Sequence, residues 1–127
     1  MLNDLQILPS QDPSRYVALR GRRGLITVNI RIPRTAIDDL PESGGHPTTV
    51  EQRTAFVSQN LDAIRVIADK KLKRGDAQPA DWEERFVLDV NIDNRDFSEY
   101  LGDRANRLSY AAFSPGSTWA DRSGRFE

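Results

Sequence analysis

The sequence contains no cysteine and a single histidine, His46. Without cysteine, disulfides, thiolate nucleophiles and thiolate metal sites are excluded, and one histidine excludes sites that need two imidazoles from this chain. No apolar run approaches the roughly 20 residues of a membrane-spanning helix, and the N-terminus lacks the apolar centre of a signal peptide. We therefore expect a cytoplasmic protein, or a virion protein if it belongs to a phage, with no membrane contact, metal or cofactor.

The 127 residues suit one domain, because 38% apolar residues are enough for a core and 29% charged residues are too few for general disorder. A net charge of -1 predicts no general affinity for nucleic acid or anionic membranes. The charges fall in blocks. Residues 1–34 hold six arginines against two aspartates, whereas residues 76–103 hold nine acidic residues against two arginines. Such blocks predict charged faces that bind one another.

Two segments alternate apolar and polar residues with a period of two. Ile26, Val28, Ile30 and Ile32 share one face of residues 25–32, and residues 86–93 repeat the pattern. This period indicates strands with one buried face. Residues 16–19 predict a further strand, so residues 15–32 are expected to form a β-hairpin that turns at residues 21–24.

Residues 49–74 have helical periodicity, with Phe56, Leu61, Ile64 and Ile67 on one stripe. Thr48 and Glu51 have the spacing of a capping box, which places the helix start there. The fold predicted is α+β: an antiparallel sheet of three to five strands with this one long amphipathic helix packed on one face. Residues 1–101 are expected to form a single domain.

Residues 102–127 differ from the rest, because serine, glycine, arginine and aspartate dominate and four aromatic residues are interspersed. We expect an extended C-terminal arm with these aromatic anchors: Tyr110, Phe113, Trp119 and Phe126. The arm has two alternative positions, on its own domain or on a neighbouring chain.

Two basic clusters are candidate contacts for phosphate or a protein partner. The first is the hairpin tip with Arg20, Arg22 and Arg23, and the second is the helix end with Lys70, Lys71, Lys73 and Arg74. A solvated turn is the alternative for the first cluster, and compensation of the helix dipole is the alternative for the second.

No catalytic or metal-binding constellation is predicted. Asp89, Asn91 and Asp93 alternate like the start of a calcium loop, but the sixth position is Asn94 instead of glycine and the twelfth is Tyr100. A polar sheet face accounts better for these residues. His46 is expected to be a surface residue, and no glycine-rich phosphate loop occurs.

Residues 25–93 resemble a small proteobacterial family of uncharacterised single-domain proteins. The likeness lies in residues 32–40 (IPRTAIDDL), in Ala55, Phe56, Asn60 and Ile64, and in residues 67–71 (IADKK). It implies an α+β fold and carries no implication for chemistry.

From these observations we expect a non-enzymatic interaction protein, a subunit of a homo-oligomer or of a larger phage or bacterial assembly held partly by its C-terminal aromatic arm. The alternative is a small nucleic-acid-binding regulator that uses the basic hairpin tip. The two differ in one observable, since nucleic-acid binding through arginines weakens steeply with added salt.

Overall fold

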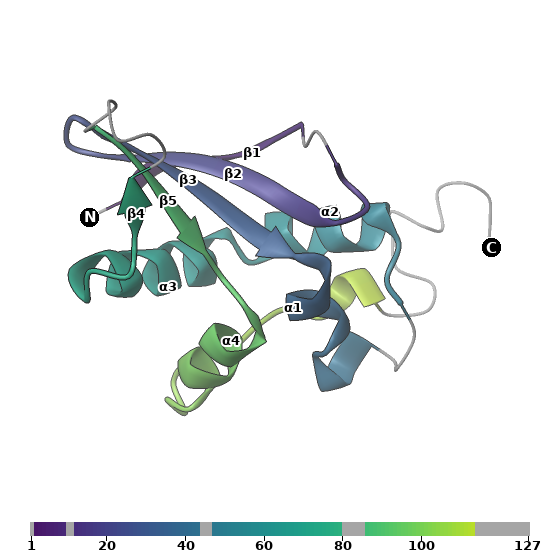
Figure 1. Cartoon of the computed structure of the whole chain (residues 1–127). Helices are drawn as coiled ribbons and strands as arrows, with labels where there is room; N and C mark the ends of the chain where they lie inside the picture. The colour runs from purple at the N-terminus through teal and green to yellow at the C-terminus, as the bar shows by residue number, and fades with distance from the viewer. Residues whose placement is uncertain (1, 10–11, 44–46, 80–85, 114–127) are drawn as a thin grey trace.

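The computed structural model describes residues 2–9, 12–43, 47–79 and 86–113. Within them, a mixed five-stranded sheet with the order β1-β2-β3-β5-β4 forms one layer. The helices form the second layer, and Figure 1 shows them together on one side of the sheet. The predicted α+β class is therefore confirmed. In the part of the chain that the structure describes, no helix is long and apolar enough to cross a membrane.

The first three strands form an antiparallel meander, which consists of β1 (Asn3–Leu8), β2 (Tyr16–Arg23) and β3 (Ile26–Pro33). The next strand in the sheet, β5 (Val87–Asn91), runs parallel to β3, and the two-residue β4 (Gln78–Pro79) pairs antiparallel with β5. The prediction of an antiparallel sheet is thus wrong for the β3–β5 pair. The intervening helices carry the chain back across the sheet, as parallel neighbours require.

Four α-helices and two short 3-10 turns complete the described fold. They are α1 (Arg34–Asp38), η1 (Pro41–Ser43), α2 (Val50–Gln59), α3 (Leu61–Lys73), α4 (Asn94–Leu101) and η2 (Ala111–Phe113). Helix α2 begins one residue later than predicted, because Thr49 and Gln52, in place of Thr48 and Glu51, form the capping box. Each side chain there accepts a hydrogen bond from the backbone N–H of the other.

The predicted single helix over residues 49–74 is broken at Asn60, which separates α2 from α3. Its backbone leaves the helical region, at φ -123° and ψ 28°. The buried Asn60 amide donates to the carbonyls of Phe56 (2.8 Å) and Ser109 (2.9 Å), and its Oδ1 accepts from the N–H of Ser109 (2.7 Å). Asparagine competes well with helical hydrogen bonding, so the break follows from a side chain that periodicity does not register.

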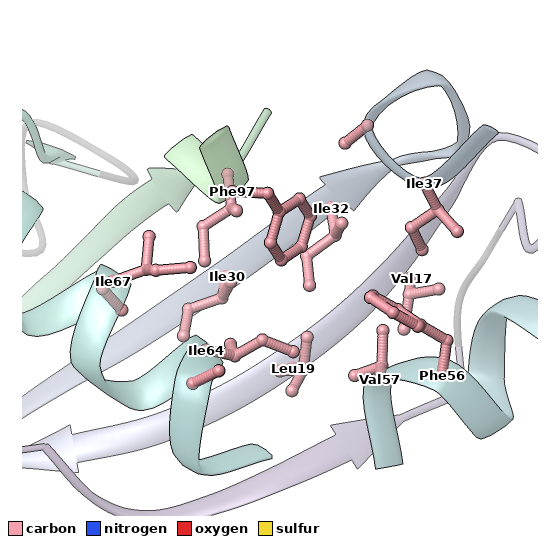
Figure 2. Close-up of a cluster of buried hydrophobic side chains, with 14 of the residues drawn as sticks. Val17, Leu19, Ile30, Ile32, Ile37, Phe56, Val57, Ile64, Ile67 and Phe97 are labelled. Carbon is pink, nitrogen blue, oxygen red and sulfur yellow. The ribbon is translucent and has the colours of Figure 1, made fainter. Parts of the chain in front are cut away.

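The core lies between the helices and one face of the sheet. Strands β2 and β3 supply Val17, Leu19, Ile30 and Ile32, and the helices supply the aromatic and aliphatic side chains drawn opposite them in Figure 2. The largest of these, Phe56 and Phe97, are fully buried and meet edge to face with their ring centroids 5.9 Å apart. This face confirms the period-two prediction for residues 25–32.

The hairpin turns later than the sequence predicts. Gly21, Arg22 and Arg23 continue strand β2, and the turn is at Gly24, whose φ of +62° suits glycine. Gly21 instead lies on the core face, where an added Cβ would approach Leu2 Cδ1 to 3.0 Å. Its lack of a side chain makes room for Leu2, a packing role that has no local sequence signature.

The segment just before residue 114 packs on the core of its own chain. Leu108 and Ala112 are buried, and Phe113 stacks on Phe56 with 5.3 Å between ring centroids. Tyr110 also stacks on Phe56, at 6.2 Å. Two of the four predicted arm anchors therefore contact their own domain. The other two, Trp119 and Phe126, lie outside the described residues.

Candidate functional site

The face of the sheet opposite the helices is polar, and we call it the open face. Side chains on β2, β3 and β5 alternate between the core and this face. Directly paired residues across the strands therefore share it: Tyr16, Ala18, Arg20 and Arg22 on β2, Thr27, Asn29 and Arg31 on β3, and Val87, Asp89 and Asn91 on β5. Arg20, Arg22, Arg31 and Asn91 are exposed. The helices of Figure 1 leave this face free.

A row of hydrogen bonds crosses the middle of the open face. Arg20 Nε donates to Asn29 Oδ1 at 3.3 Å, and Asn29 Nδ2 donates to Asp89 Oδ1 at 3.2 Å. The three residues are paired in register across β2, β3 and β5. The row is therefore positive at β2 and negative at β5, with a neutral amide that holds both ends in place.

Next to this row, Arg31 lies over the ring of Tyr16, with 4.8 Å from its guanidinium carbon to the ring centroid. This cation–π contact draws the Arg31 side chain from β3 toward β2. A shallow hollow of about 300 Å³ is lined by Tyr16, Arg20, Arg31 and Asp89 among others. It presents guanidinium groups, one carboxylate and one covered aromatic ring.

The fold thus separates the arginines of the predicted basic tip. Arg20 and Arg22 lie on the open face with Arg31, which joins them from the next strand. Arg23 is half-buried at the end of β2 and points away from that face by strand alternation. The residues that sequence reasoning did not group with the tip are Asn29 and Asp89. Cross-strand register would have found them once the turn was placed at Gly24.

The second basic cluster, at the end of α3, binds acidic residues of this chain. Lys71 Nζ is 2.7 Å from Asp96 Oδ2, and these side chains are only 14% and 7% exposed. Lys70 and Arg74 pair with Glu99 on α4, at 3.7 Å and 3.0 Å. The hydrogen bond from Arg74 holds the pKa of Glu99 below its ordinary value.

These pairs fasten α4 to α3 across a narrow cleft of about 120 Å³. Lys70, Lys71 and Arg74 thus form ion pairs with acidic residues of their own chain. Neither the phosphate or partner contact nor the compensation of the helix dipole, the two interpretations from the sequence, included these pairs. Lys73 is exposed, in the last turn of α3. The cluster therefore contributes to the packing of the two helices.

The acidic residues considered for metal or catalysis do not converge. Among the described residues, no group of three histidine or carboxylate side chains is placed to hold a metal ion. Asp89 belongs to the row of the open face, whereas Asp93 caps α4 and accepts from the N–H of Asp96 at 3.1 Å. Burial alone would raise the pKa of Asp93, but the hydrogen bonds with Asp96 and the charges of Lys71 and Arg95 together lower it. His46 lies outside the described residues.

A buried arginine on α2 has no counterpart in the sequence analysis. Arg53 is 3% exposed, and its guanidinium donates to the Thr48 carbonyl and hydroxyl and to the Pro13 carbonyl. Burial lowers its pKa, and the charge of Asp38 opposes that effect. Arg53 ties the loop before β2 to the start of α2, so it positions those elements and offers no charge to solvent.

Comparisons of the chain with protein-family models, with curated proteins and with solved structures find no match. The resemblance of residues 25–93 to a proteobacterial family therefore stays a prediction.

Proposed function

We propose that the chain is a non-enzymatic interaction protein that forms a homo-oligomer by pairing the open faces of two copies. The observation that carries the proposal is the hydrogen-bonded row from Arg20 through Asn29 to Asp89, whose charge changes sign across three strands. A face with this distribution is complementary to itself. The chain's separate basic and acidic blocks agree with such pairing.

The symmetry of a dimer determines which side chains of the two copies meet. A two-fold axis that runs along β3, between the two sheets, brings β2 of one copy over β5 of the other. Arg20 then faces Asp89 of the second copy, and the same pair forms again on the other side of the axis. Asn29 faces the axis and meets the Asn29 of the second copy across it.

The other arginines of the open face are compatible with this arrangement. Arg22 is in register with Thr27 and Val87, so it meets the neutral Val87 of the second copy. Arg31 is on β3 and therefore also faces the axis. Its contact with Tyr16 draws the guanidinium toward β2, away from the Arg31 of the second copy. The arrangement therefore places no like charges directly opposite each other.

The test is the solution mass of the full chain by light scattering at low and near-physiological salt. We expect a dimer that Arg20→Asp or Asp89→Arg converts to monomer. The double variant R20D/D89R, which exchanges the two charges, should recover the dimer. Arg104→Asp, an exposed site outside the sheet, is the matched control and should not change the mass. A monomeric wild-type chain at low salt, or failure of the double variant to recover the dimer, contradicts the proposal.

A second candidate function is binding of single-stranded nucleic acid by the same face. It is favoured by the gathering of Arg20, Arg22 and Arg31 beside Tyr16, since arginines and aromatic rings on an open sheet are typical of such platforms. The chain's net charge of -1 and the ring already covered by Arg31 favour the first candidate.

A titration of a labelled oligonucleotide at increasing salt separates the two candidates. Nucleic-acid binding through these arginines must weaken by orders of magnitude as salt rises, and Arg22→Ala must reduce the salt dependence by about one phosphate contact. Absence of binding at low salt rejects the second candidate and leaves the first untouched.

A further inference from the structure

An apolar groove lies at the end of the sheet where β1 and β2 approach the start of α2. Ile7 and Leu8 of β1, Val17 of β2, and Val50 and Thr54 of α2 line it, with prolines at its rim, around about 450 Å³. Val50 is 36% exposed there. The groove lies at the edge of the core, to which Val17 belongs, and it borders the open face, whose Tyr16 and Ala18 also line it.

The chain itself supplies an apolar segment that starts close to this groove. Residue 113 is the last that the structure describes, and Phe113 is fixed on Phe56 of α2, the helix that also lines the groove. Fourteen residues follow, 114–127, and they include Trp119 and Phe126. Trp119 is six residues beyond the anchored ring.

Helical geometry gives the distance that residues 114–119 must span between Phe113 and the groove. Val50 and Phe56 are six positions apart on α2, so at about 100° per residue they project roughly 120° apart around its axis. Phe113 and the groove therefore lie on different sides of one helix, whose diameter with side chains is about 10–12 Å. Six extended residues span about 20 Å, so residues 114–119 are long enough to cross α2.

We propose that this groove binds Trp119 of the same chain. An indole needs a large apolar surface and an acceptor for its N–H. The aliphatic lining supplies the surface, and the hydroxyl of Thr54 at the rim supplies an acceptor. A segment joined to α2 by so short a connection reaches the groove at a far higher effective concentration than a second copy does. This contact within one chain does not require dimerisation through the open face.

The test uses tryptophan fluorescence of the full chain. The sequence has two tryptophans, Trp82 and Trp119, so Trp82→Phe leaves Trp119 as the sole indole. In this W82F background we expect a blue-shifted emission maximum and weak quenching by acrylamide. Adding Val50→Asp should shift the emission to that of exposed tryptophan and raise the quenching constant several-fold.

Val50 is the first residue of α2, where an aspartate is compatible with the helix dipole, and far-ultraviolet circular dichroism checks that the fold persists. The second variant is Thr54→Arg, at an exposed position that lines the same groove. It should shift the emission and raise the quenching constant as Val50→Asp does. Leu25→Asp, at an 81% exposed leucine of the hairpin turn, is the matched control and should leave the emission unchanged.

Three outcomes overturn the proposal: an exposed Trp119 in the W82F chain, an emission that neither groove variant alters, or a signal lost on dilution. The last would assign the groove to Trp119 of another copy. None of these readouts is the solution mass, so the result does not depend on whether the open faces pair.

Discussion

The two faces of the sheet are built from the same strands but are held together by different interactions. On β3, Ile30 and Ile32 are fully buried under the helices, whereas Asn29 and Arg31, which alternate with them along the strand, face the other way. The covered face obtains its stability from close packing, in which volume matters most. The open face holds its side chains by polar contacts at 3.2–3.3 Å and one cation–π contact. The comparison predicts that substitutions separate by face, with stability sensitive on one and association sensitive on the other.

The largest expected effect is on the covered face, at Phe56. Phe56→Ala removes a fully buried ring that contacts Phe97, Tyr110 and Phe113, and it should lower the free energy of unfolding by about 3–5 kcal/mol. Urea denaturation followed by circular dichroism measures the loss. Phe86→Ala, at a ring that is 63% exposed, makes the same chemical change and should cost far less. Similar losses for both variants would mean that burial does not distinguish them.

A smaller effect is expected at Gly21, which is the core-facing glycine of β2. Gly21→Ala places a Cβ 3.0 Å from Leu2 Cδ1 and 3.2 Å from the Asn3 carbonyl, and overpacking of this kind costs about 1–3 kcal/mol. Arg22→Ala, one residue along the strand and on the open face, should change stability by less than about 0.5 kcal/mol. Equal denaturation midpoints for the two variants would contradict the assignment of Gly21 to the packed face.

On the open face, Arg31→Ala removes the contact with the Tyr16 ring. The contact is 4.8 Å long and solvent-accessible, so its loss should cost about 0.5–1 kcal/mol. A double-mutant cycle with Tyr16→Leu measures the coupling between the two side chains. A coupling of zero would show that the two side chains do not support each other.

The smallest effect concerns acid, at the contact between α3 and α4. The pKa of Glu99 is held below its ordinary value of 4.5 by Arg74, so the folded chain binds this proton less readily than the unfolded chain. Its contribution to stability is therefore present above pH 4.5 and is lost as the pH falls through the lower, folded pKa. Glu99→Gln should flatten the loss of stability between pH 5 and pH 3. Arg74→Gln should flatten it less, because Lys70 still pairs with Glu99, and the double variant should flatten it no further than Glu99→Gln alone.

Sequence patterns located the strands and helices better than their connections. The alternation of Ile26, Val28, Ile30 and Ile32 identified the buried face of β3, because period two depends only on which side chains meet the core. The same period is compatible with either strand direction, so it could not show that β5 runs parallel to β3. That direction depends on how far the intervening helices carry the chain.

The remaining differences arise from contacts between residues distant in sequence. The sequence predicts a turn at Gly21, because the Leu2 side chain that fills the space beside it is 19 positions earlier. The sequence predicts dipole compensation or a partner contact for Lys71, because its actual partner, Asp96, is 25 positions later. The open face was predicted in parts, as a polar face and a basic tip. The row through Asn29 required the register of three strands.

The hydrogen bonds of the Asn60 amide have a consequence for folding during synthesis. Two of its hydrogen bonds join it to Ser109, 49 positions later. During synthesis, β1 to β3 and both helices leave the ribosome before Ser109 does, and until then this buried amide lacks those two partners. An unpaired buried polar group costs about 1–3 kcal/mol. The junction of α2 and α3 therefore reaches its full stability only when the last described segment of the chain has been added.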